Sequence, residues 1–167
     1  MFSWYALQVR SRFGKAVSTA LRAKGYEEFL PVYRTVRRSG GGGCDLELPL
    51  FPGYLFCRLD PSERLLPVLT IPGVMRIVSV GKILLPVTDD EIETVKAVSQ
   101  CGLPAEPWPF LGIGCRVSLE RGPLAGLEGM VVSVDGAHRL VVSVSLLQRS
   151  IAVKIERSWV RCMCRAN

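Results

Sequence analysis

The chain has 167 residues, a length that suits one domain of ordinary size or two small ones. Apolar residues make up 49% of it, which is enough to build hydrophobic cores and excludes a disordered chain. Lys and Arg number 21 against 15 Asp and Glu, and the excess lies in residues 1–60 and 109–167. Such an excess is compatible with nucleic acid contact, and it is also common on ordinary protein surfaces.

Several other classes of protein are disfavoured. The apolar stretches are far shorter than the roughly 20 residues that span a bilayer, and the first residues do not resemble a signal peptide. We therefore expect a cytoplasmic protein whose six cysteines are reduced thiols. Cys162 and Cys164 lack the spacing of a zinc site, so we expect no metal and no cofactor.

The N-terminal part begins with a predicted strand at 4–10, because aromatic and β-branched residues are concentrated there. Apolar residues then recur at helical spacing until Gly25, which ends the predicted helix. The buried stripe of this helix is expected to hold Phe13, Ala16, Val17, Ala20 and Leu21.

Further strands are predicted at 29–33, 46–48, 54–59 and 74–80. Asp60 and Pro61 favour a helix start, although Pro67 interrupts the turns that follow. A capping box from Thr88 to Glu91 starts a last helix, which runs to about Ser99. This order of elements predicts an α+β domain over residues 1–100, with helices packed on an antiparallel sheet.

A change of composition follows. Prolines at 104, 107 and 109 break all periodicity, so residues 101–109 are predicted to be a stiff linker. Residues 110–164 contain short alternating segments with glycines between them. Because closure removes the exposed edges of a small sheet, we expect a small all-β barrel here.

No set of residues indicates catalysis. His138 stands in a predicted turn, and the run from Gly40 to Gly43 lacks a phosphate-loop lysine. Asp89 and Asp90 suit a helix N-terminus, where negative charge is favourable. We therefore expect a binding protein rather than an enzyme.

Two segments carry a specific resemblance. The first is Leu50-Phe51-Pro52-Gly53-Tyr54-Leu55-Phe56, together with Trp4-Tyr5. The second is Gly122-Pro123-Leu124-Ala125-Gly126-Leu127-Glu128-Gly129, followed by the apolar segment 139–149. In this order, and across a Pro-rich linker, they resemble the N-terminal and KOW domains of the NusG family of transcription elongation factors. The resemblance spans residues 3–162, and it implies an SH3-like barrel for the KOW domain.

The resemblance implies that the N-terminal domain binds the clamp helices of the RNA polymerase β′ subunit and suppresses pausing. It places the polymerase contact at Trp4, Phe51, Pro52, Gly53 and Tyr54. The Pro-Gly bend is expected to present Phe51 and Tyr54 outward, because exposed aromatic side chains anchor interfaces. The alternative is that both aromatic residues belong to the core.

The resemblance also implies that the KOW domain recruits a ribosomal protein or the termination factor Rho. Its contact patch corresponds to Leu124, Leu127, Leu146 and Leu147, which we expect to lie close together and partly exposed. The alternative for some of these leucines is the barrel core.

A third set of residues concerns DNA. Specialised paralogues of the family contact the non-template strand through the first helix, which here carries Arg12, Lys15, Thr19 and Arg22 on one face. The alternative is an ordinary solvated surface.

The segment Leu-Phe-Pro-Gly-Tyr-Leu-Phe and the Glu-Pro-Trp-Pro-Phe linker resemble the corresponding segments of the UpxY-like and RfaH-like antiterminators. We therefore predict a specialised transcription elongation and antitermination factor that acts as a monomer. The alternative function is a ribosome- or RNA-binding KOW protein without a polymerase role. Such a protein is expected to place aromatic side chains on an open sheet face, where bases stack on them.

Overall fold

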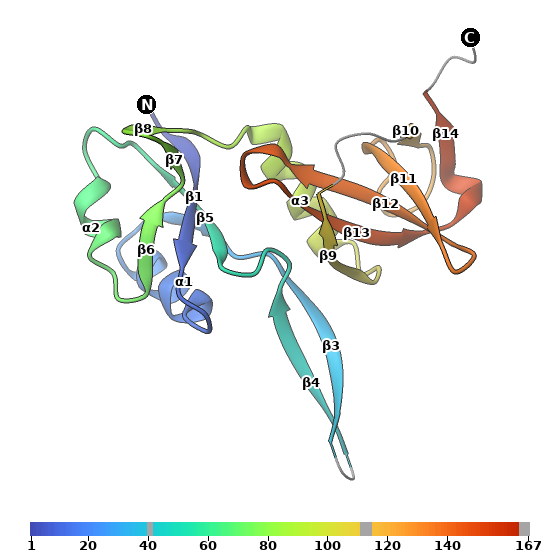
Figure 1. Cartoon of the computed structure of the whole chain (residues 1–167), viewed down its shortest axis with the longest axis horizontal. Coiled ribbons are helices and arrows are strands. Elements are labelled where there is room, and N and C mark those ends of the chain that lie inside the picture. The colour runs from blue at the N-terminus through green and yellow to red at the C-terminus, as the bar shows by residue number, and fades with distance from the viewer. Residues whose placement is uncertain (40–41, 111–114, 164–167) are drawn as a thin grey trace. The chain divides into compact units, whose positions relative to one another are not determined.

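The computed structural model describes residues 1–39, 42–110 and 115–163. The chain divides into two compact units, Met1–Ile92 and Glu93–Asn167, and each is described by itself (Figure 1). The fold is mixed, with few helices and many strands. Along the described residues, no helix is long and apolar enough to cross a membrane.

The first unit is built on a four-stranded antiparallel sheet with the order β2-β5-β1-β6. Its strands are β1 (Ser3–Val9), β2 (Glu27–Phe29), β5 (Tyr54–Leu59) and β6 (Val74–Ile77). Helices α1 (Gly14–Ala23) and α2 (Leu65–Leu69) supply apolar side chains to one face of this sheet. The core between them includes Leu7 of β1, Leu55 of β5 and Leu21 of α1.

Helix α1 is rotated relative to the predicted stripe. The buried residues are Val17, Ser18 and Leu21, whereas Phe13 is 39% exposed and Ala16 is exposed. The reason is polar: the Ser18 hydroxyl donates a 2.7 Å hydrogen bond to the Glu28 carboxylate of β2. Buried polar groups need such partners. The bond to Glu28 therefore keeps Ser18 buried, although the apolar spacing of α1 predicts that position 18 faces solvent.

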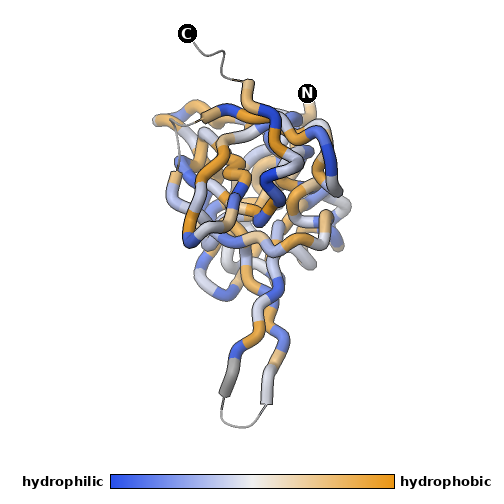
Figure 2. The backbone as a smooth tube through the Cα atoms, turned by 90° about the vertical axis from the view of Figure 1, so that its right-hand side faces the viewer, coloured by the Kyte–Doolittle hydropathy of each residue, from blue (hydrophilic) through white to orange (hydrophobic). Residues whose placement is uncertain are grey.

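A two-stranded ribbon projects from the first unit (Figure 2). It consists of β3 (Val32–Ser39) and β4 (Gly42–Pro49), which pair in register from Val32 and Pro49 outward. Hydrophilic and hydrophobic residues alternate along it in Figure 2. Alternation of this kind usually accompanies one buried face, but Val36 and Leu46 of the ribbon are both exposed. A smaller hairpin joins β7 (Ser79–Val80) to β8 (Ile83–Leu84).

The turn after β5 is organised by Asp60. Its carboxylate accepts hydrogen bonds from the Ser62 hydroxyl at 2.6 Å and the Ser62 backbone N–H at 3.0 Å, and it pairs with the N-terminal ammonium of Met1. These bonds lower the pKa of Asp60 to about 2, and the bond from the ammonium has the largest effect. The expected helix start at Asp60 is therefore a turn, and α2 begins only at Leu65.

Helix α3 (Asp89–Gln100) confirms the prediction from the capping box. The Glu91 backbone N–H donates to the Thr88 hydroxyl at 3.3 Å, and the Thr88 N–H donates back to the Glu91 carboxylate at 3.4 Å. Two of the N–H groups that a helix start leaves without intrahelical partners are satisfied in this way.

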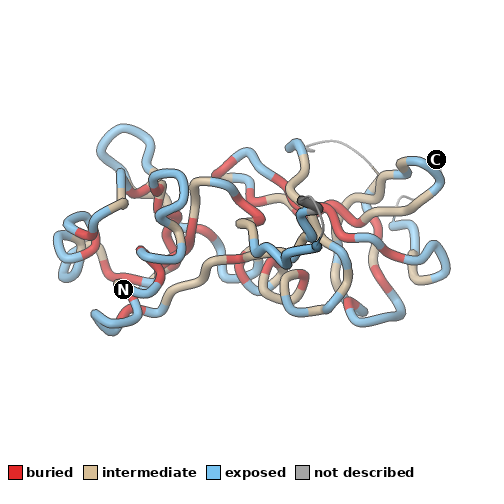
Figure 3. The backbone as a smooth tube through the Cα atoms, turned by 90° about the horizontal axis from the view of Figure 1, so that it is seen from below, coloured by how far each residue is buried: buried red, intermediate tan, exposed pale blue. Residues whose placement is uncertain are grey.

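The second unit contains a six-stranded antiparallel sheet, whose described strands follow the order β14-β10-β11-β12-β13-β9. Figure 3 shows buried stretches along its strands and exposed stretches in the turns between them. Short 3₁₀ turns η1 (Ser145–Leu147) and η2 (Arg157–Trp159) follow β12 and β13. The strands are β9 (Ala105–Pro109), β10 (Cys115–Leu119), β11 (Glu128–Val134), β12 (Ala137–Val144), β13 (Arg149–Ile155) and β14 (Val160–Cys162).

The segment predicted as a linker differs in part from the expectation. Ala105–Pro109 is strand β9, paired with β13 so that Pro107 lies opposite Ile151 and Pro109 opposite Arg149. β9 pairs with β13 alone among the described strands, and proline is tolerated at such an edge because its missing N–H is not needed on the outer side. A Pro-rich composition therefore did not prevent strand pairing here.

Candidate binding surfaces

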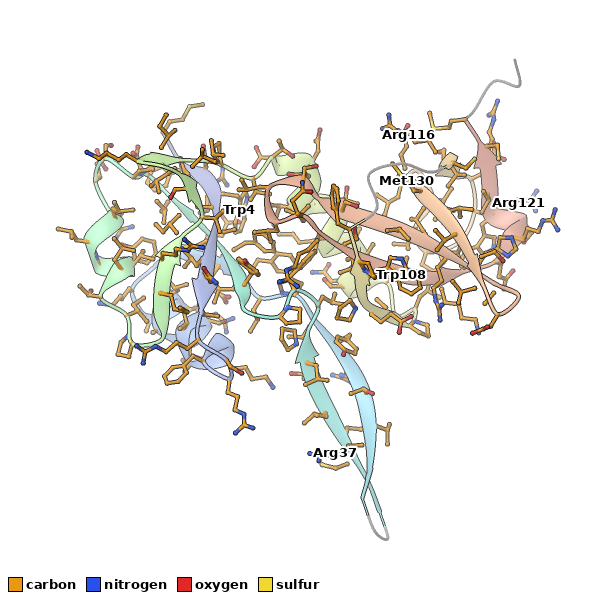
Figure 4. All side chains as sticks on the ribbon, in the orientation of Figure 1. Trp4, Arg37, Trp108, Arg116, Arg121 and Met130 are labelled. Carbon is orange, nitrogen blue, oxygen red and sulfur yellow. The ribbon has the colours of Figure 1, made fainter. Side chains whose placement is uncertain are left out.

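Four aromatic side chains gather on the face of the first sheet that lies opposite the α1 core. Phe29 is paired with Phe56 across β2 and β5, and their rings stack with centroids 6.1 Å apart. Phe51 meets Phe56 edge-on at 5.8 Å. Trp4 is on this face because it alternates with the core residue Tyr5 along β1 (Figure 4). We call Trp4, Phe29, Phe51 and Phe56 the aromatic face.

The Pro-Gly bend separates Phe51 from Tyr54. The Tyr54 N–H donates to the Phe51 carbonyl at 3.0 Å, and Gly53 has a left-handed φ of 84° that favours glycine. Phe51 is fully buried, whereas Tyr54 is half-buried. The expectation that the bend presents both aromatics outward is thus wrong for Phe51, because its ring turns back onto Phe56.

A mainly apolar groove of about 320 Å³ lies beside this bend. Pro52, Gly53 and Tyr54 line it on one side, and the base of the β3–β4 ribbon lines it on another. Arg12 and Lys15 also line it. The structure therefore brings three of the predicted polymerase-binding residues next to two of the predicted DNA-binding residues. Trp4 and Phe51 do not line the groove.

The predicted basic face is exposed, but it is not purely cationic. Arg12 precedes α1 with a left-handed φ of 69°, and the Thr19 hydroxyl donates to the Lys15 carbonyl at 3.0 Å. Lys15 pairs with Glu47 of β4 at 3.1 Å, and Arg22 pairs with the buried carboxylate of Glu28. These two carboxylates compete with any phosphate for the same cations.

The predicted leucine patch falls in two turns of the second unit. Pairing of Met130 with Val141 puts the start of β11 and the end of β12 at the same end of a hairpin. The segments 124–127 and 145–147, which adjoin those ends, are therefore neighbours in the topology. Leu127 and Leu146 are half-buried, whereas Leu124 and Leu147 are buried, which corrects the expectation of partial exposure for those two.

Sequence reasoning missed Phe29 and Phe56 as members of the aromatic face. The signal that identifies them is alternation along β5, where Leu55 and Cys57 belong to the α1 core and Phe56 points the other way. Within the described residues, no group of three or more side chains suits a metal ion.

Comparisons with known proteins give the class of protein. A family model described as "Transcription termination factor nusG" matches residues 2–96, more than half of the chain. The transcription termination/antitermination protein NusG of Thermus thermophilus is 26% identical, over 94% of this chain and 96% of that protein. A solved structure described as "Domain interaction in Thermotoga maritima NusG" has the same fold, with a TM-score of 0.62, 22% identity and 98% of each chain covered.

The family is described as a transcription termination factor, and the Thermus protein is described as a transcription termination/antitermination protein. The chain belongs to the NusG family, whose members are transcription factors and not enzymes.

Proposed function

We propose that the first unit binds the clamp helices of the RNA polymerase β′ subunit through the aromatic face and the Pro52–Tyr54 bend. The observation that carries this proposal is the contact of Phe51 with Phe56, on the sheet face that also holds Trp4. Trp4, Phe51 and Phe56 are buried in this structure. Pro52, Gly53 and Tyr54, which line the groove, are therefore the accessible part of the proposed contact, and the aromatic face supports the bend through Phe51. Aromatic residues concentrate binding energy because they bury a large area at little conformational cost.

The mechanism is one of differential affinity. A protein that binds both sides of the DNA channel more tightly in the closed, elongating state shifts the clamp towards that state. Pausing is suppressed because a paused polymerase with a looser clamp binds the factor less well. The proposed specialised antitermination role is supported by the sequence Leu-Phe-Pro-Gly-Tyr-Leu-Phe at positions 50–56.

The second unit acts as the recruiting module in this proposal. Residues 110–164 form a KOW domain with an SH3-like barrel, joined to a domain of residues 1–100. The half-buried Leu127 and Leu146 are the accessible part of a patch that binds a ribosomal protein or Rho, and the buried Leu124 and Leu147 support them.

The test is the binding of purified RNA polymerase to the Phe51→Ala variant. We expect the dissociation constant to rise about 30-fold, which corresponds to about 2 kcal/mol, because loss of the buried Phe51 ring releases the Pro52–Tyr54 bend from its contact with Phe56. Phe51→Leu, which keeps most of the apolar volume, is expected to retain more of the affinity. Because Phe51 is buried in the free chain, hydrogen exchange of β1 and β5 must show that each variant is folded.

Phe13→Ala is the matched control, since it removes the same ring from an exposed position outside the aromatic face. It is expected to bind polymerase as the unmodified chain does. If folded Phe51→Ala also binds as tightly as the unmodified chain, the aromatic face is not the polymerase contact.

A second contact is proposed with the non-template DNA strand, through Arg12, Lys15, Thr19 and Arg22. It is supported by the groove, which places Arg12 and Lys15 beside the Pro52–Tyr54 bend. Polymerase bound at that bend then brings the basic side chains near nucleic acid. Three cations neutralise few phosphates, and Glu47 and Glu28 partly offset two of them, so the affinity is modest and falls with added salt.

The Lys15→Ala, Arg22→Ala double variant is expected to crosslink less to the non-template strand in a paused complex, while polymerase binding is unchanged. Lys24→Ala with Lys82→Ala removes the same charge elsewhere on the surface and serves as the control. Equal crosslinking by the two double variants at low salt would make this helix face an ordinary surface.

A further inference from the structure

Two cysteines of the second unit meet across neighbouring strands. Cys115 is the first residue of β10 and Cys162 is the last residue of β14, and their sulfur atoms are 3.7 Å apart. Val117 lies opposite Cys162, so Cys115, two residues away, is on the same sheet face as a diagonal neighbour. The two residues are 47 positions apart in the sequence, so the fold alone brings their thiols together.

We propose that Cys115 and Cys162 are a modification site, at which a low-molecular-weight disulfide reversibly converts the two thiols into an intrachain disulfide. The thiolate of one cysteine attacks a sulfur of the reagent, forms a mixed disulfide and expels one thiolate. The second cysteine then attacks the protein sulfur of that mixed disulfide and expels the other thiolate. The two protein thiols are oxidised, the reagent is reduced to two thiols, and the two protons go to the leaving thiolates.

Accessibility sets the order of these steps. Cys162 is exposed and Cys115 is half-buried, so Cys162 reacts first with a reagent from solvent and Cys115 resolves the mixed disulfide. Closing the bond brings the sulfurs from 3.7 Å to about 2.05 Å. Diagonal neighbours lie about 7 to 8 Å apart, so the two strand ends must also move closer together.

Cys57 provides an internal contrast. It is buried in the core of the first unit, and burial, followed by the charges of Glu28 and Glu27, raises its pKa to about 12. It therefore stays protonated and out of reach of a reagent, and we expect no reaction there.

The disulfide would link β10 covalently to β14, the last strand of the second sheet. β14 has three residues, and β10 is its partner among the described strands. A covalent link between the first residue of β10 and the last of β14 restricts the unfolded chain over a long loop. It therefore raises the melting temperature of this unit, by about 5 °C or more.

The experiment treats the full chain with oxidised glutathione and measures the intact mass, the disulfide-linked peptides and the melting temperature. The same treatment is given to Cys115→Ser, Cys162→Ser and Cys164→Ser. Cys164 lies outside the described residues and is the nearest competing thiol in the sequence. We expect the unmodified chain and Cys164→Ser to yield a linked Cys115–Cys162 peptide and to melt higher, and a reductant to reverse both changes. Cys44 is also exposed, so a separate mixed disulfide on it is expected in every variant.

Cys115→Ser is expected to stop at a stable mixed disulfide on Cys162, and neither it nor Cys162→Ser is expected to gain thermal stability. Because only the fold brings the two thiols together, the variants are compared below their melting temperatures, where each is folded. An intrachain disulfide that persists in Cys162→Ser, or its absence from the oxidised unmodified chain, would overturn the proposal.

Discussion

Leu7→Ala is expected to lower the free energy of unfolding of the first unit by about 2 to 5 kcal/mol. Leu7 lies in the central strand β1, directly between Leu55 of β5 and Ile77 of β6, and it is fully buried. The truncation removes apolar contacts and leaves a cavity that neighbours on two paired strands cannot fill. Denaturant-dependent hydrogen exchange of β1 and β5 measures the loss in this unit separately from the other.

Leu66→Ala makes the same chemical change at a site on α2 that is 73% exposed. Surface substitutions of this kind change stability by about 0.5 kcal/mol or less. Comparable losses in the two variants would mean that the sheet face under α1 and α2 is not the core of the unit. Polymerase binding by folded Leu7→Ala at low denaturant should be retained, because Leu7 lies on the face opposite Phe51 and Trp4.

The elements with strong local signals were predictable from the sequence. The capping box fixed the start of α3, and the aromatic run at the N-terminus gave β1. The rotation of α1 was not predictable from apolar spacing. It depends on a hydrogen bond between Ser18 and Glu28, whose strand begins only after α1 ends. Tertiary polar contacts of this kind leave no periodic trace in a helix.

The bend of the candidate site was predictable from the sequence, but the directions of its aromatic side chains were not. The Phe-Pro-Gly-Tyr segment predicts a bend, and the bend is present, with Gly53 in the left-handed region. The direction of the Phe51 side chain depends on Phe56, and the alternation of β5 determines which way Phe56 points. The ion pairs of Lys15 and Arg22 likewise join α1 to β4 and β2, so a helical projection of α1 alone shows only the cations.

Gly122→Ala is expected to destabilise the second unit by about 2 to 5 kcal/mol, from two added causes. Gly122 has a left-handed φ of 84°, which is unfavourable for alanine. A Cβ atom there would also lie 2.7 Å from the Trp159 ring, closer than real contacts allow. The ring belongs to a turn that is fixed by a 2.8 Å bond from the Glu120 N–H to the Trp159 carbonyl, so it cannot move away without cost.

Gly126→Ala separates these two causes. Gly126 has a similar φ of 92°, but nothing lies within 4 Å of the position its Cβ would take. Its cost is therefore the backbone strain alone, about 1 to 2 kcal/mol. Denaturant-dependent hydrogen exchange of β10 and β12 compares the variants within this unit. Equal losses would mean that the Trp159 ring moves aside at little cost. Since the turn from Gly122 to Leu127 also sets the positions of Leu124 and Leu127, Gly122→Ala should weaken the partner binding that we propose for the leucine patch more than Gly126→Ala does.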